Sequence, residues 1–188
     1  MNGSRTAAKM NDAAKEYGGA LFELALEEGM DGEILGEVRA IRALFEENRE
    51  YVRLLSSPNI PKDERVRCLD QLLLGRVHPY TLNFLKIITE RGHISSVYGC
   101  FDEYEKLYYD THGIIRAKAE SAVELSESQK KRLTERLEAL TGKQVELSCF
   151  VNPGLIAGVR LTVSNKLYEG SIRAKLTSIG ESLASLTL

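Results

Sequence analysis

The apolar residues of this 188-residue chain change their spacing once, near Gly113. Before that point they recur every three or four positions, which is typical of amphipathic helices. After it they alternate with polar residues, beginning with Ile115 and Ala117, which is typical of a half-buried strand. The two spacings predict two structural units, a helical one over residues 1–109 and a small α+β one over residues 110–188.

The first of these units is predicted to be a six-helix bundle with short connections. Most of its expected helices carry one apolar side, with residues at offsets near 0, 3, 4 and 7. In the first helix that side is formed by Tyr17, Ala20, Leu21, Leu24 and Ala25. In the second, fourth and sixth helices it is formed by Ile34, Val38, Ile41 and Phe45, by Val66, Leu69 and Leu73, and by Val97, Phe101, Tyr104 and Tyr108. The fifth helix, which starts at Pro79, is apolar almost all round and is expected at the centre of the bundle.

Glycine and proline residues predict where the helices of the bundle end. Gly29 and Gly32 are expected to end the first helix and to bracket a turn. A short third helix should stop before Pro58, because the residue that precedes a proline avoids the helical conformation. Asn59 is then a possible cap for the fourth helix, with Pro61 in its first turn.

The second unit is predicted to be a small βαββα domain, which makes the whole chain an α+β protein that is mainly helical. Ser126 and Gln129 form the Ser-x-x-Gln pattern of a capping box at the start of its first helix. Its final helix has an apolar row that consists of Ile172, Leu176, Ile179, Leu183 and Leu186. Most of this row is expected to cover the sheet face that contains Val159 and Leu161.

Motifs for catalysis or cofactor binding are absent from the sequence, including the glycine-rich nucleotide loops, the zinc-protease helix and the serine-hydrolase elbow. The three histidines, His78, His93 and His112, are expected at helix borders, where they cap a helix or meet solvent. The three widely spaced cysteines indicate neither a disulfide framework nor a zinc site. We therefore expect a protein that is not an enzyme and needs no cofactor or metal.

Charge and hydropathy argue against two further classes of partner. The net charge is −2 and the isoelectric point is near 6.0, so no overall field draws the chain onto nucleic acid. Lys130, Lys131 and Arg132 form a basic triplet, which is either a solvated helix face or a contact for an acidic partner surface. No apolar run approaches the roughly 18 residues that a membrane-spanning helix needs, so direct membrane insertion is not expected.

Several segments in chain order resemble the delta subunit family of F-type ATP synthases, whose mitochondrial member is the oligomycin-sensitivity-conferring protein. Residues 15–25 read KEYGGALFELA, an aromatic residue followed by small residues and a Phe-x-x-Ala run, and residues 84–92 read FLKIITERG. The strongest likeness lies near the C-terminus, where two small residues in a strand are followed by a turn and an acidic-Gly-Ser triplet. Two positions depart mildly from the family pattern, Ala157 in place of Gly and Glu169 in place of Asp.

This resemblance implies a non-catalytic stator component of the F-type proton-translocating ATP synthase. Such a subunit links the catalytic alpha/beta hexamer to the peripheral stalk, so that rotor torque is resisted and proton flow is coupled to ATP synthesis. It would act as a monomer within the complex, on the cytoplasmic side of the bacterial cell membrane, held there peripherally through its partners. From the residues alone, a nucleic-acid-binding or adaptor module without enzyme activity is the alternative.

The resemblance also implies where the partners bind. The bundle over residues 1–109 is expected to accept the N-terminal helix of an alpha subunit in a groove between its first and fifth helices. The contacts expected in this groove come from Tyr17, Ala20, Asn83 and Ile87. An internal hydrogen bond is the other interpretation of Asn83. The unit over residues 110–188 is expected to bind the b subunits of the peripheral stalk through Leu183 and Leu186, at the exposed end of the apolar row.

Overall fold

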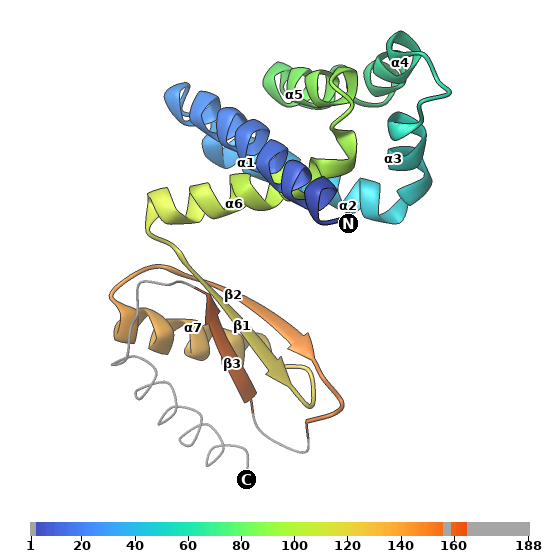
Figure 1. Cartoon of the computed structure of the whole chain (residues 1–188). Helices are drawn as coiled ribbons and strands as arrows, with labels where there is room; N and C mark the ends of the chain where they lie inside the picture. Colours follow the sequence, from blue (N-terminus) through green and yellow to red (C-terminus); the bar gives the residue numbers. More distant parts are fainter. Residues whose placement is uncertain (1–2, 156–158, 165–188) are drawn as a thin grey trace. The chain divides into compact units, whose positions relative to one another are not determined.

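The computed structural model describes residues 3–155 and 159–164. The first unit, Met1–Tyr108, contains α1 Gly3–Glu27, α2 Asp31–Glu47, α3 Arg49–Ser56, α4 Lys62–Leu73, α5 Pro79–Glu90, the 3-10 helix η1 Ile94–Ser96 and most of α6 Val97–His112. The second unit, Tyr109–Leu188, begins in the last turn of α6 and contains β1 Ile115–Ser121, α7 Glu127–Thr141, β2 Val145–Val151 and β3 Val159–Ser164 (Figure 1). The predicted α+β fold, mainly helical, is confirmed, and the division falls one residue before the predicted boundary.

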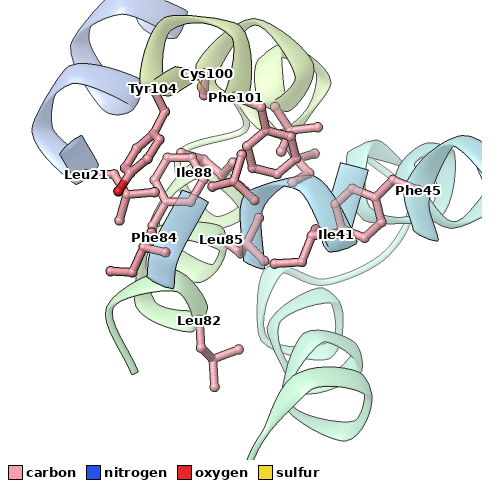
Figure 2. Packing of buried hydrophobic residues seen from close by; sticks show 14 of the residues in the cluster. Leu21, Ile41, Phe45, Leu82, Phe84, Leu85, Ile88, Cys100, Phe101 and Tyr104 are labelled. Carbon is pink, nitrogen blue, oxygen red and sulfur yellow. The ribbon is translucent and has the colours of Figure 1, made fainter. Parts of the chain in front are cut away.

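The core of the first unit is one buried cluster to which α1 to α6 all contribute. The predicted stripe of α2 is buried throughout, and that of α6 is buried except for the half-buried Tyr108. Figure 2 shows Phe84 and Ile88 of α5 packed with Phe101 of α6, and the rings of Phe84 and Phe101 have centroids 6.3 Å apart. α5 packs against α1, α2 and α4, but its apolar surface is not covered at Ile87, which is exposed.

α1 and α6 cross at very short range, because each helix has a glycine where it contacts the other helix. A Cβ atom added to Gly18 of α1 would collide with the carbonyl oxygen of Cys100 in α6. A Cβ atom added to Gly99 of α6 would lie 2.9 Å from the Cβ of Ala14. Only residues without a side chain permit such an approach of one backbone to another helix. The small residues of α1 therefore set how deeply it packs against α6.

Two predicted helix boundaries are wrong. Gly32 does not bracket a turn but lies inside α2, because Gly29 makes the left-handed turn alone, with a φ of 68°, and Asp31 already starts the next helix. Asn59 does not cap α4. Pro61 occupies the cap position with extended backbone angles, φ −52° and ψ 143°, and a side chain two residues upstream of it is too far away to reach the first helical amides.

The buried side of α4 is rotated relative to the prediction. Leu69 and Leu73 are buried, but Val66 is only half-buried and Arg65 is buried beside it. The Arg65 guanidinium donates a hydrogen bond of 2.9 Å to the carbonyl oxygen of Leu55, in the last turn of α3. A helix C-terminus leaves carbonyl groups without partners and favours a nearby cation, so α3 provides a polar contact for this buried arginine.

β1 is the central strand of the second unit, in the order β2-β1-β3. It pairs in parallel with β2 and antiparallel with β3. Its alternate residues Ile115, Ala117 and Ala119 are buried in one cluster with Leu133 and Leu137 of α7, as the alternation predicts. This cluster shares no residue with the core of the first unit.

The predicted capping box of α7 is confirmed, because the side chains and backbone amides of Ser126 and Gln129 bond reciprocally. Val159 and Leu161 of β3 are half-buried against the same core as α7. The alternation also assigns Leu155 to the third strand, but β3 begins only at Val159 and Leu155 is not in a strand. Residues 156–158, the turn after Ser164 and the whole of the final helix lie outside the described residues.

Candidate partner-binding surface

α1 and α5 pack against each other, and their apolar contact continues to the surface of the first unit. Leu21 of α1 and Phe84 of α5 belong to the same buried cluster (Figure 2). Three residues further along each helix stand Leu24 and Ile87, whose exposed fractions are 38% and 47%. Residues i and i+3 are neighbours on a helix surface, so both side chains stand next to the buried contact. Together with the exposed Ala20 they form what we call the α1/α5 strip.

The structure places three of the four residues predicted to bind the alpha subunit on the surface of these two helices. Ala20, Asn83 and Ile87 are exposed, whereas Tyr17 is half-buried and its ring lies 5.7 Å from that of His93. The alternative interpretation of Asn83 is wrong, because its exposed side chain takes part in no hydrogen bond among the described residues. Tyr17 therefore belongs partly to the core that supports the strip.

The apolar spacing predicts Leu24 on the apolar side of the first helix, but Leu24 is exposed in the structure. The side of α1 that is buried in the structure instead contains Gly18, Leu21 and Ala25, which lie at offsets 0, 3 and 7. Leu24 lies six residues after Gly18, at the edge of this buried side. The sequence contains a signal for the direction of the buried side, because the small residue Gly18 lies where α1 approaches α6.

The two borders of the α1/α5 strip carry different charges. On α1, Glu16, Glu23 and Glu27 are exposed and share one side of the helix with Ala20. None of the three forms an ion pair within the described parts of the chain. On α5, Lys86 pairs with Asp70 of α4 at 2.5 Å, while Glu90 and Arg91 are both exposed. The α1 border is thus acidic and the α5 border is mixed.

A cavity of about 680 Å³ lies beside α5, and its walls come from α2, the α4–α5 turn and α5. Asn83 lines this cavity, together with Leu74, Leu82 and Lys86. Glu37 also lines the cavity, and its carboxylate accepts hydrogen bonds from the backbone amide of His78 at 2.6 Å and from the hydroxyl of Thr81 at 2.5 Å. This carboxylate of α2 thereby satisfies donors at the start of α5. Asn83 thus stands between the cavity and the strip.

The histidines lie at helix borders, as predicted: His78 and His93 occupy cap positions and His112 ends α6. Burial raises the pKa of the Cys100 thiol to about 12, so this cysteine is a protonated core residue at neutral pH. The residues that the structure describes include no cluster of three His, Cys, Asp or Glu side chains suited to a metal ion. Within the same residues, no helix has the length and apolar character needed to span a membrane.

The residues predicted to bind the stalk, Leu183 and Leu186, lie outside the described part of the chain.

Residues 13–183 match the family described as ATP synthase delta (OSCP) subunit. The ATP synthase subunit delta of Lachnoclostridium phytofermentans is 31% identical over 176 residues, which cover 93% of this chain and 97% of that protein. The subunit delta of Desulfitobacterium hafniense strain DCB-2 is 32% identical over 171 residues, which cover 91% and 96%. A chain in the cryo-EM structure of the Toxoplasma gondii mitochondrial ATP synthase hexamer has a similar fold, with a TM-score of 0.68 and 16% identity, over 90% of this chain and 96% of that one.

The described residues define a mainly helical α+β protein with two separate cores and an exposed apolar strip between two helices. The chain belongs to the ATP synthase delta (OSCP) subunit family. Its role is that of a stator subunit, a structural part of a complex that is itself catalytic.

Proposed function

We propose that this chain connects the catalytic alpha/beta hexamer of an F-type ATP synthase to the b subunits of its peripheral stalk. The first unit binds the N-terminal helix of an alpha subunit, and the second unit binds the stalk. The connection resists rotor torque, so that proton flow is coupled to ATP synthesis. The observation that carries this proposal is the exposed α1/α5 strip, because an amphipathic partner helix would cover it.

The strip is suited to adhesion by burial of apolar surface. Complete burial of a leucine or isoleucine side chain contributes about 1.5–3 kcal/mol. Leu24 and Ile87 are already more than half covered, so a partner helix would gain about half of that amount from each. Ala20 has a short side chain, which lets the backbone of the partner come close to α1.

The second unit supports the proposal with exposed apolar side chains of its own. Val123, Phe150 and Val151 are all exposed. β1 and β2 pair Ser121 with Val151, and the Ser121 hydroxyl donates a hydrogen bond of 2.6 Å to the carbonyl oxygen of Val123. These contacts bring the three apolar residues to one end of the sheet, where they would meet a partner.

Leu183 and Leu186 are proposed to add to the stalk contact, since both belong to the apolar row of the final segment. With both partners bound, the chain acts as a monomer within the complex. It is held peripherally at the cytoplasmic side of the bacterial cell membrane through the complex, with no membrane insertion of its own.

Titration calorimetry of the full chain with an alpha-subunit N-terminal peptide tests the proposal. Ala20→Leu should weaken binding by about 1–3 kcal/mol, because the larger side chain overpacks the contact. Ile87→Ala should weaken it by about 1 kcal/mol, because the exposed part of this side chain is no longer there to be buried. Leu54→Ala is the matched control, since this leucine is also 38% exposed but lies on α3, and it should bind like the wild type.

Unchanged affinity for both Ala20→Leu and Ile87→Ala, with intact circular dichroism, would remove the α1/α5 strip as the binding site. An equal loss in Leu54→Ala would show that binding follows the general apolar surface of the bundle. Retention of RNA or DNA in a filter-binding assay would instead favour the nucleic-acid-binding alternative.

A further inference from the structure

We propose that the helix docked on the α1/α5 strip carries a row of Lys or Arg residues along the border that faces α1. This inference rests on the proposed function and specifies the chemistry of the partner at that same surface. The α1/α5 strip alone would accept an amphipathic helix whether its borders are basic or acidic. The charged residues beside the strip decide which of the two helices binds more tightly and which of its borders lies against α1.

The α1 border carries three glutamates on the same side of the helix as Ala20. Glu16, Ala20, Glu23 and Glu27 follow one another at offsets 0, 4, 7 and 11, so all four share one side of the helix. With a rise of about 1.5 Å per residue, the three carboxylates extend over about 16 Å. That length matches about three turns of a partner helix lying along α1.

The charges of this row are not neutralised within the described residues. Glu23 and Glu27 are four residues apart, a spacing at which like charges repel on a helix surface. Lys15 is exposed but lies five residues before Ala20, on a different side of α1. Of the exposed glutamates at this border, none has an ion pair among the described residues. A cationic partner would relieve the repulsion.

The α5 border does not have the same character. Lys86 already pairs with Asp70, and the neighbouring exposed residues Glu90 and Arg91 have opposite charges. A partner helix with basic residues on only one border would therefore gain most when that border lies against α1. Charge thus specifies the partner more narrowly than the apolar strip does.

Two peptides test this inference. Both carry the apolar stripe of the alpha-subunit N-terminal helix, and they differ only in whether the positions bordering the stripe are Lys or Glu. Fluorescence anisotropy with the full chain should show the Lys-bordered peptide binding about tenfold more tightly at 50 mM salt, from a few exposed ion pairs. At 300 mM salt the preference should fall to about twofold, because salt screens exposed charges.

Variants of the chain locate the preference. Changing Glu16, Glu23 and Glu27 together to Gln should leave binding of the two peptides within about twofold of each other. The matched control changes Glu46, Glu47 and Glu50 to Gln, which removes three exposed carboxylates from the junction of α2 and α3. This control has the same net charge as the first variant and should keep the tenfold preference.

The outcomes separate the inference from the proposed function. Equal binding of the two peptides to the wild type at low salt overturns the inference alone. A preference that survives in the Glu16, Glu23 and Glu27 variant, or that disappears equally in the control, also overturns it. Absence of binding by both peptides overturns the proposed function and this inference with it.

Discussion

At the scale of the residue, two helical glycines have opposite surroundings. Gly18 of α1 faces the backbone of Cys100, and an added Cβ atom there would overlap the carbonyl oxygen. Gly36 of α2 has no atom within 4 Å of an added Cβ. The first glycine is required by tertiary packing, because backbone atoms cannot move aside as a flexible side chain can. The second only adds conformational freedom to the unfolded chain.

Gly18→Ala should therefore destabilise the first unit by about 2–3 kcal/mol, through a forced separation of α1 and α6. Gly36→Ala is the matched control and should stabilise the chain by about 0.5–1 kcal/mol, since alanine favours a helix interior. Urea unfolding followed by circular dichroism measures both. If the two variants proved equally stable, the close crossing of α1 and α6 would be wrong.

At the scale of the element, α7 shows how local and tertiary interactions combine. The side-chain oxygen of Gln129 accepts a hydrogen bond of 2.8 Å from the Ser126 amide, and the Ser126 hydroxyl accepts one of 3.3 Å from the Gln129 amide. Both bonds satisfy amides at the start of the helix that would otherwise lack partners. Leu133 and Leu137 then cover the central strand, so the cap helps to hold the helix that completes this core.

Ser126→Ala should cost about 1 kcal/mol of stability, because one amide of the first turn loses its acceptor. Lys131→Ala, at an exposed position of the same helix, should change stability by less than about 0.5 kcal/mol. Thermal unfolding of the two variants gives the comparison. Equal melting temperatures for Ser126→Ala and the wild type would mean that the capping box contributes nothing measurable.

At the scale of the whole molecule, the described residues form two hydrophobic cores with no residue in common. One lies within Met1–Tyr108 and the other within Tyr109–Leu188. Independent cores allow each unit to keep its own partner surface when the other is altered. This arrangement suits a connector, whose two contacts must both hold under load.

Deletion of residues 183–188 should lower association with the stalk and leave alpha-peptide binding unchanged, because the α1/α5 strip depends only on the first core. A pull-down with the soluble part of the b dimer measures the first effect, and titration calorimetry with the alpha peptide measures the second. Full retention of b binding, with normal circular dichroism, would place the stalk surface elsewhere in the second unit.

Much of the local structure could be predicted from the sequence, because it depends on interactions between near neighbours. The apolar stripe of α2, the alternation of β1 and the capping box at Ser126 are all found where the pattern predicts them. The family, too, could be predicted from ordered motifs, and the match over residues 13–183 confirms it. Periodicity and capping are properties of one element, so no information about distant partners is needed.

Only the tertiary structure decided which part of each apolar side is covered. Leu24 and Ile87 belong to apolar helices, yet the crossing of α1 with α5 and α6 leaves both exposed. Arg65 is buried because the end of α3 offers it a carbonyl group, which the pattern within α4 could not reveal. β1 became the central strand through pairing with residues about 30 and 40 positions away. The sequence determined the elements and their family, and contacts between distant elements determined the candidate binding surface, because burial depends on what packs against a side chain and not on its own hydrophobicity.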